Sequence, residues 1–420
     1  MPKPTERRVN MPRTAPPHEP DDRQHALRAG RFAANFLLSP ETLRQRQTMK
    51  WQFYPPEILP AWVAEMDYDL APAIADVLRW WAQAREAGYP YRQRDRAEIG
   101  LARAFSRYTL RAFDWETDPN NVLAVNELVQ AIYLAIMAFS EPGEGVLLQT
   151  PCYPPFYQAI DDTGRRLRTS ALVDDGSGFA IDFEHAERQL DANTRILILC
   201  NPHNPTGRVL RRDELEKLAD FVEAHDLLVI ADEIHADLIY PDRRHIPFAT
   251  VRSSLAARTV TLNSASKSFN IPGLRCGVMY FGTPELKRRF TRRLPARLLG
   301  YPAGIGIDAT VAAWDDGEEW LGDLRHYLYD RRAQTLAALH ERLPQARIRT
   351  PEATYFAWLD LSELALPAPA GEWYRQRASL ALNAGEAFIQ GGEQRVRLNF
   401  ATSENILAQV LGRLIDSDRS

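Results

Sequence analysis

The segment SASKSFNIPGLR, residues 264–275, places one lysine between two serines and an arginine eight residues further on. Lys267 is one of five lysines among 51 basic residues, so the chain otherwise uses arginine for positive charge. A lysine amine forms a Schiff base with an aldehyde, whereas the guanidinium of arginine stays charged and does not. We therefore predict that Lys267 is a site of covalent attachment.

Two other polar groups follow apolar runs that are typical of buried strands. Asp232 in DEIH follows LLVIA, Asn204 in NPHNPTG follows RILILC, and Lys267 follows TVTLN. The carboxyl ends of parallel strands meet at one edge of a sheet, so we expect these groups to lie close together. A buried carboxylate keeps a pyridine nitrogen protonated, and an amide donates to a phenolate oxygen. The set therefore predicts pyridoxal phosphate, an electron acceptor bound through a lysine.

The phosphate of such a cofactor needs donors of its own. Ser264 offers a hydroxyl, Arg275 offers a bidentate guanidinium, and the amino end of the helical segment LVQAIYLAIMAF offers free backbone N–H groups. His235 lies three residues after Asp232 and is expected near the same region. An ordinary buried histidine is an equally good interpretation of that residue.

The DEIH motif has two other interpretations. It resembles the second nucleotide motif of a helicase, but such an enzyme needs a GxxxxGK[ST] loop, and none of the five lysines follows a glycine. The first strands are also not followed by GxGxxG, which argues against a conventional dinucleotide site. The remaining alternative is that the two acids cap the helix that follows.

Composition excludes several classes of partner. The chain has 420 residues, 25% of them charged, and a net charge of −4, which predicts neither nucleic-acid nor anionic-membrane binding. Its three cysteines form no CxxC pair, so we expect no metal site, no disulfide framework and a reducing, cytoplasmic setting. No apolar run reaches the roughly 20 residues of a membrane-spanning helix.

Hydrophobic patterning predicts the fold class. From about residue 121, short apolar runs alternate with longer amphipathic segments such as RDELEKLADFVEAH. This alternation predicts an α/β domain whose mostly parallel sheet has helices on both faces. The first 37 residues are rich in proline and arginine near their start and lack the apolar region of a secretory signal. We predict that residues 1–37 are a disordered extension.

The ordered set NPxNPTG, DEIH, SxSKxxxxxGLR and RLNFA resembles the fold type I pyridoxal phosphate enzymes of the class I and II aminotransferase superfamily. Within it, MKWQFYPPEILPAWVAEMDYDLAPAI, EPGEGVLLQTPCYPPF and GEAFIQGGEQRVRLNFA are similar to the cystathionine beta-lyase-like C-S lyase branch. The resemblance covers residues 38 to 415. It implies a homodimer with shared active sites and a small amino-acid substrate.

The resemblance also implies a role for each matching residue. Lys267 would form the Schiff base and act as general base, Asp232 would pair with the pyridinium, and Asn204 would donate to the phenolate oxygen. Further cofactor contacts would come from Tyr153 (stacking on the ring), Ser264, Arg275, the backbone of Leu128 and Val129, His235, and Tyr89 of the neighbouring subunit. Arg397 would bind the substrate carboxylate, and the segment containing Trp62 and Ala64 would line the substrate side.

The resemblance also sets the expected architecture. Residues 38–85 would form the amino-terminal arm and part of a small domain. Residues 86–319 would form the large cofactor domain, with a sheet of the seven-stranded type. Residues 320–420 would complete a smaller α+β domain that carries Arg397 and closes on the substrate.

Three positions depart from the family pattern. Glu127 stands where many members have glycine before the helix that receives the phosphate. Either its carboxylate turns outward and only the backbone binds, or phosphate binding differs in this chain. Glu65 replaces the aspartate of WVADMD, and NFATSEN lacks the usual CPR-like ending. These differences bear on substrate preference more than on cofactor binding.

Several reactions share these residues. The resemblance favours a C-S β-lyase that acts on cystathionine or S-substituted cysteines and gives thiol, pyruvate and ammonia. Transamination is the main alternative, and β- or γ-replacement or cyclisation of an unusual amino acid is a third. A regulatory binding protein is a different class, but the chain has no appended helix-turn-helix segment and no basic stripe.

Overall fold

A computed structural model describes residues 22–85, 87–92, 94–174, 176, 178–241 and 243–417. Its main feature is an eight-stranded sheet with the order β4-β11-β10-β9-β8-β5-β6-β7. In chain order its strands are β4 (Val122–Val125), β5 (Gly145–Thr150), β6 (Arg166–Asp174), β7 (Phe179–Ile181), β8 (Thr194–Cys200), β9 (Leu228–Asp232), β10 (Thr259–Asn263) and β11 (Gly277–Phe281). The pairs β6·β5, β5·β8, β8·β9 and β9·β10 are parallel, and the outer pairs are antiparallel.

The mostly parallel sheet is confirmed, with one more strand than the expected seven. The short β7 is the additional edge strand and pairs antiparallel with β6. The central strands β5, β9 and β10 are buried at every position, as expected for a parallel sheet that is covered on both faces. In β10 threonine alternates with apolar residues, and Thr259 and Thr261 are buried as well.

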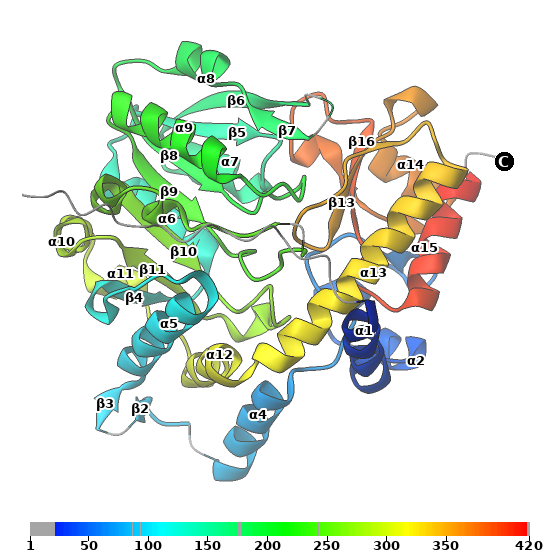
Figure 1. Cartoon of the computed structure of the whole chain (residues 1–420), viewed down its shortest axis with the longest axis horizontal. Coiled ribbons are helices and arrows are strands. Elements are labelled where there is room, and N and C mark those ends of the chain that lie inside the picture. Colours follow the sequence, from blue (N-terminus) through cyan, green and yellow to red (C-terminus); the bar gives the residue numbers. More distant parts are fainter. Residues whose placement is uncertain are drawn as a thin grey trace, which may run out of the picture.

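Helices cover both faces of this sheet (Figure 1). Alternate side chains of one strand face opposite layers: Ile198 packs with the helices of one face, whereas Leu197 packs with those of the other. The first face is covered by α6 (Leu128–Phe139), α7 (Pro154–Asp162) and α10 (Pro284–Arg293). The second is covered by α8 (Phe183–Gln189) and α9 (Arg212–Ala224), and near β4 and β11 by α5 (Ala97–Phe113) and α12 (Gly304–Asp316).

A second, antiparallel sheet has the order β12-β13-β16-β15. Its strands are β12 (Arg347–Ile348), β13 (Phe356–Asp360), β15 (Asn383–Ala384) and β16 (Arg395–Asn399). Figure 1 shows the long helix α13 (Glu318–Arg342) running beside α15 (Glu404–Asp416), and α14 (Ala370–Arg377) packs near β15 and β16. This sheet lies within residues 320–420, where we expected the smaller α+β part. The exact domain boundaries stay a prediction.

Segments from before the large sheet also join this second part of the molecule. Strand β1 (Leu59–Pro60) pairs in parallel with β14 (Leu380–Ala381). The helices α2 (Pro40–Gln45), α3 (Met49–Gln52) and α4 (Pro72–Ala84) flank β1, and a small hairpin of β2 (Tyr91–Arg92) and β3 (Asp95–Arg96) follows α4. A short helix, α11 (Ala296–Leu299), connects α10 to α12.

The predicted disordered extension, residues 1–37, is wrong for its second half. Residues 1–21 lie outside the described residues, but helix α1 spans Asp22–Phe36. Phe32 is fully buried, with its ring 5.3 Å from that of Tyr327 on α13, and Arg31 Nη2 donates to Asp323 Oδ1 at 2.7 Å. The prediction failed because this helix is stabilised by packing against α13, a partner about 300 residues away that local composition does not reveal.

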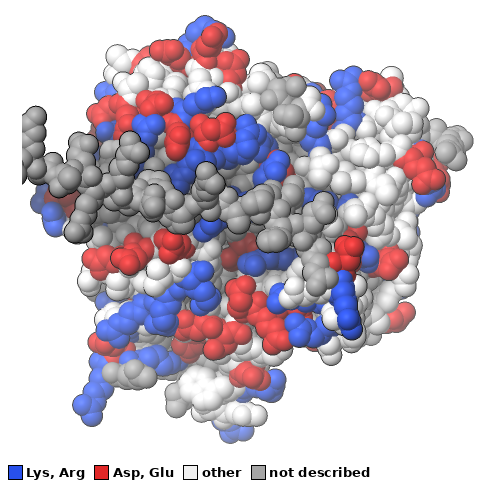
Figure 2. Space-filling model, in the orientation of Figure 1, with Lys and Arg blue, Asp and Glu red and all other residues white. Residues whose placement is uncertain are grey.

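The surface carries both signs of charge. Figure 2 shows acidic and basic side chains interspersed over the described part of one face. Within the described residues, no helix is long and apolar enough to span a membrane.

Candidate active site

A cavity of about 140 Å³ opens at the carboxyl edge of the large sheet. It brings together ten of the residues singled out from the sequence: Ala64, Leu128, Val129, Tyr153, Asn204, Asp232, His235, Ser264, Lys267 and Arg275. Three others, Trp62, Tyr89 and Arg397, do not line it. Ser266, Cys200 and Cys276 also line the cavity, and the sequence analysis gave them no role there.

Lys267 and Asp232 lie at the carboxyl ends of neighbouring parallel strands. Asp232 ends β9 and pairs in register with Leu262 of β10, and Lys267 comes five residues after Leu262, beyond the end of that strand. Removal from water and the nearby charge of Arg397 together lower the pKa of Lys267 to about 8, against the opposing effects of Glu65 and Asp232. Burial raises the pKa of Asp232 to about 6. The site therefore holds an amine that is partly neutral near physiological pH beside a carboxylate shielded from water.

The acids of DEIH have separate roles. Asp232 Oδ1 accepts a hydrogen bond from the Ile234 N–H at 3.1 Å, so the capping interpretation holds for one short turn. Glu233 Oε1 accepts from the Phe248 N–H at 2.9 Å, and its Oε2 lies 3.0 Å from His245 Nε2. Both side chains of this Glu–His pair are almost fully buried, which makes Glu233 a structural residue.

His235 lies at the cavity wall with its ring almost fully buried. Its Nδ1 has no hydrogen-bond partner among the described residues, and its ring meets that of Phe356 edge to face at 5.7 Å. Burial lowers the pKa of His235 to about 3, so the ring is neutral over the physiological range. An unpartnered buried nitrogen beside a cavity is a polar group available to a ligand.

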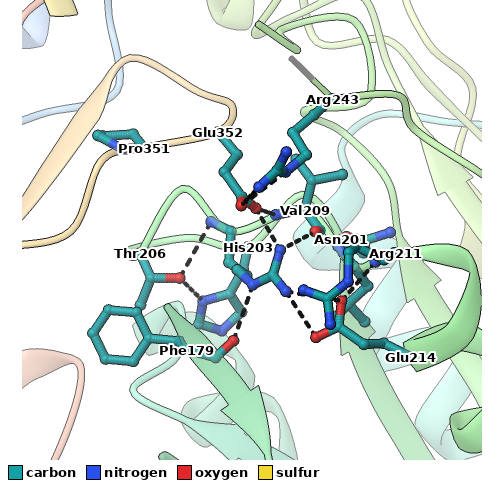
Figure 3. A network of polar contacts seen from close by, with 12 residues as sticks. Phe179, Asn201, His203, Thr206, Val209, Arg211, Glu214, Arg243, Pro351 and Glu352 are labelled. Atoms are coloured by element: carbon teal, nitrogen blue, oxygen red, sulfur yellow. Dashed lines mark hydrogen bonds and ion pairs between the residues drawn. The ribbon is translucent and has the colours of Figure 1, made fainter. Parts of the chain in front are cut away.

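The loop that carries Asn204 rests on a buried ion network that sequence reasoning missed (Figure 3). Arg208 contacts both oxygens of Glu214, at 2.7 and 2.8 Å, and Glu352 Oε2 at 2.6 Å. Glu352 also binds Arg243, with 2.9 Å between its Oε1 and Arg243 Nε. Because Glu352 belongs to the segment that leads into β13, the network joins the Asn204 loop to the second sheet.

Gly207 lets the Asn204 loop approach the segment that leads into β13 closely. Its φ is +70°, and an added Cβ would come within 2.7 Å of the Pro351 side chain and 2.9 Å of the Ala353 carbonyl. Its own carbonyl accepts hydrogen bonds from the N–H groups of Glu352 and Ala353, both at 2.9 Å. A side chain at this position would strain the backbone and separate the two segments.

Arg397 is buried behind the cavity wall and contacts one of the wall residues, Asn204. Its Nη1 donates to Asn204 Oδ1 at 2.8 Å, and its Nη2 donates to the Trp62 carbonyl at 3.1 Å and to Asn383 Oδ1. Its guanidinium lies 4.0 Å from the ring centre of Phe356, and its Nε has no partner among the described residues. The side-chain oxygen of Asn204 accepts this hydrogen bond, which leaves the two N–H donors of its amide for other contacts.

Side chains hold the backbone on the substrate side, residues 62–66. Asn399 Nδ2 donates to the carbonyls of Val63 and Glu65, both at 2.7 Å. Asn270, with φ +55°, donates to the Met66 carbonyl and accepts from the Met66 N–H, both at 2.8 Å. The Ala64 carbonyl accepts from the Tyr355 hydroxyl at 3.2 Å, and that of Trp62 accepts from Arg397 as described above. Five consecutive carbonyls are thus satisfied by side chains from distant elements.

A buried ion pair fixes the end of that segment. Lys50 Nζ lies 2.7 Å from Asp67 Oδ2, and both side chains are 1% exposed. Trp51 Nε1 donates to the other oxygen of Asp67 at 2.7 Å. The carboxylate is fully partnered, so the segment is anchored by charge as well as by hydrogen bonds.

The opposite end of the cavity has a different chemistry. Helix α6 begins at Leu128, and its first N–H groups donate no hydrogen bond to the side chain of the N-cap residue, Glu127. Glu127 Oε2 instead lies 2.6 Å from Arg275 Nη1. Ser264, which was expected to contact a phosphate, lines the cavity, and its hydroxyl donates to the Cys276 carbonyl at 2.6 Å.

The remaining expected residues are placed as follows. Tyr153 lies at the cavity wall at the start of α7, and burial raises its pKa. The ring of Trp62 packs 5.0 Å from that of Phe53. Tyr89 is 97% exposed and lies on a separate surface with Tyr91 and Tyr301.

Comparison with known proteins gives consistent matches. Residues 66–414 match the family model described as aminotransferase class I and II. The chain is 32% identical to cystathionine beta-lyase PatB of Bacillus subtilis (strain 168) over 375 residues, covering 88% of this chain and 96% of that protein.

Solved structures match over similar lengths. The crystal structure of OvoB superposes with a TM-score of 0.84 at 34% identity, covering 90% of this chain and 97% of that one. Cystalysin from Treponema denticola, described as containing a pyridoxal 5'-phosphate cofactor, superposes with a TM-score of 0.84 at 26% identity, covering 91% and 98% of the two chains.

Proposed function

Because the chain belongs to the aminotransferase class I and II family, we propose that it is a carbon–sulfur β-lyase that acts on cystathionine or S-substituted cysteines. Its cofactor is pyridoxal 5'-phosphate. The observation that carries the proposal is the meeting of Lys267 and Asp232, from neighbouring strands, at one cavity. Water is consumed, and the products are a thiol, pyruvate and ammonia.

The residues present fit this cofactor. The cavity offers an amine, a carboxylate shielded from water, an amide, a guanidinium and the uncapped amino end of α6, which match an aldehyde, a pyridine nitrogen, a phenolate oxygen and a phosphate. The unpartnered Nδ1 of His235 is a further buried polar atom at this wall. When bound, the cofactor accepts the electron pair that remains after a proton leaves the substrate Cα.

Lys267 would hold the cofactor covalently and, once displaced by the substrate amine, remove the Cα proton at its Nζ. A pKa near 8 suits this role because a substantial fraction of the amine is neutral at physiological pH. Asp232 would keep the ring nitrogen protonated. Its burial supports this assignment, since a carboxylate screened by water would affect that nitrogen less.

Arg397 would bind the substrate carboxylate. Its guanidinium is 3% exposed and held by Asn204, Asn383 and the Trp62 carbonyl, while Nε remains without a partner among the described residues. A carboxylate that reached Nε would meet a donor whose orientation is already set, so little side-chain entropy would be lost on binding. Asn383 is thereby proposed as a positioning residue.

Assembly and location belong to the same proposal. The exposed aromatic residues Tyr89, Tyr91 and Tyr301 favour a homodimer in which this surface is covered, with Tyr89 reaching the partner's cofactor phosphate. The three cysteines are free and buried, which supports a cytoplasmic setting. Light scattering on the purified chain tests the dimer, and a monomer at micromolar concentration would contradict it.

The activity test uses the full chain with bound cofactor. L-cystathionine or an S-alkyl cysteine is added, and pyruvate and free thiol are measured in the absence of any keto-acid acceptor. Equal amounts of pyruvate and thiol over many turnovers support the lyase. Bleaching of the cofactor's visible band, with recovery only after a keto acid is added, indicates an aminotransferase instead. If the purified protein bound no cofactor, the regulatory alternative would replace both.

A further inference from the structure

Glu127 places a carboxylate at the phosphate end of the cavity. It is the N-cap residue of α6, directly before Leu128 and Val129, and its side chain helps to line the cavity. The carboxylate accepts no hydrogen bond from the first turn of its own helix. It reaches Arg275 instead, with 2.6 Å between Glu127 Oε2 and Arg275 Nη1. The alternative that Glu127 turns outward, away from the site, is therefore not what the structure shows.

This contact occupies the group on which anion binding at this end depends. Arg275 is the only arginine or lysine besides Lys267 among the described cavity residues, and Lys267 is required at the other end of the cofactor. The Ser264 hydroxyl donates its hydrogen bond to the Cys276 carbonyl. The donors left for a phosphate are Arg275, the α6 amino end and the hydroxyl of Ser266, which also lines the cavity. Of these only Arg275 carries a charge, and it is paired with an anion.

A phosphate dianion and a carboxylate cannot share one guanidinium without repulsion. At about 5 Å the Coulomb energy between such charges is of the order of 1 kcal/mol or more even in a well-screened environment. The existing ion pair is exposed at both ends, 64% for Arg275 and 45% for Glu127, so it contributes little by itself and opens easily. The cost to a phosphate therefore comes mainly from the charge of Glu127.

We propose that Glu127 competes with the cofactor's phosphate for Arg275 and so weakens retention of the cofactor. The inference rests on the proposed function only in that pyridoxal phosphate is the ligand. In this proposal Glu127 lowers the affinity for the cofactor, whereas the residues around it raise that affinity. A residue that merely positioned Arg275 would strengthen phosphate binding, so the two roles predict opposite effects of its removal.

The test compares the full-length holoenzyme with Glu127→Gln and with a control, Glu141→Gln. Glu141 makes an ion pair with Arg293 at 2.5 Å, exposed to a similar degree, at the other end of α6. Each protein is dialysed to release cofactor, and the dissociation constants for pyridoxal phosphate and for pyridoxal, which lacks the phosphate, are measured by absorbance and fluorescence. Thermal unfolding of each variant confirms that it is folded.

We expect Glu127→Gln to bind pyridoxal phosphate about five- to tenfold more tightly at low salt, with the gain shrinking toward one at about 1 M salt. Pyridoxal affinity stays unchanged, and Glu141→Gln matches the parent in both titrations. Unchanged or weaker binding of pyridoxal phosphate by Glu127→Gln overturns the inference, as does an equal gain for pyridoxal. Failure of every protein, including the parent, to bind pyridoxal phosphate overturns the proposed cofactor, and this inference with it.

Discussion

The two ends of the cavity are built differently. At the substrate end, the backbone of residues 62–66 is bound by buried side chains, and the Lys50–Asp67 pair is 1% exposed. At the phosphate end, the charged groups are Glu127 and Arg275, paired with each other and open to solvent. Buried groups whose hydrogen bonds are all satisfied hold the reacting groups in one geometry. Exposed charges contribute little to stability, so substitutions there can change the affinity for the cofactor without disturbing the fold. Chemistry and cofactor retention should therefore respond to different substitutions.

The largest effect is expected for Lys267→Ala. Removing the amine eliminates both the attachment point and the base, so pyruvate release should fall at least about a thousandfold, and the visible band of the bound cofactor should change. The exposed Lys217 on α9 provides a control of the same type, and Lys217→Ala should keep full activity. Turnover retained by Lys267→Ala would show that the buried end does not carry the chemistry.

Asp232→Asn should come next. The substitution keeps the shape and the turn contact to Ile234 but removes the charge that is proposed to face the ring nitrogen, so kcat should fall about a hundredfold or more. Glu233→Gln, one residue further on, changes charge equally but breaks the buried contact to His245, so it should reduce stability rather than kcat per folded molecule. Equal losses of kcat in both variants would contradict the separate roles.

Breaking one ion pair at each end compares their energetics directly. Asp67→Asn leaves the Lys50 charge buried without its partner, and the free energy of unfolding should fall by about 3–5 kcal/mol. Glu127→Gln opens an exposed pair, and its effect should stay below about 1 kcal/mol. Urea unfolding of the two variants measures the difference, and similar losses would remove the distinction between the ends.

The smallest effect concerns pH. Removal from water lowers the pKa of Lys267 to about 8, and only the neutral amine attacks an aldehyde. The rate at which dialysed protein captures pyridoxal phosphate should therefore rise about tenfold per unit up to pH 8 and then level off. Glu65 raises this pKa, so Glu65→Gln should move the midpoint to lower pH. Glu127→Gln should change the rate of pyridoxal phosphate capture without moving the pH midpoint of that rate. A shifted midpoint in this variant would contradict the separation between the two ends of the cavity.

The chemistry-bearing residues were predictable because they follow strands. Apolar or mostly apolar strand segments followed by short polar stretches identify Asp232, Asn204 and Lys267, and the parallel sheet then brings them to one edge. Asn270, Asn383 and Asn399 were given no role from the sequence. No local pattern of residues distinguishes these three from other asparagines of the chain. Their function depends on which carbonyl lies opposite, and that carbonyl belongs to a segment far away in the chain.

Local composition misjudged the amino-terminal segment. It predicted disorder up to residue 37, although α1 is held in place by α13. The deciding partner lies outside the window over which residue patterns are informative. The predicted phosphate contact of Ser264 stays a prediction, and its hydroxyl also donates to the Cys276 carbonyl, twelve residues later.

The sequence by itself determined the sheet, the class of cofactor and the three strand-end groups, because hydrophobic periodicity and residue type are local properties. Only the tertiary structure decided which side chains support those groups and where Glu127 points. Those outcomes depend on distances between residues far apart in the chain, such as Arg397 and Asn204 or Arg275 and Glu127, and such distances exist only once the chain has packed.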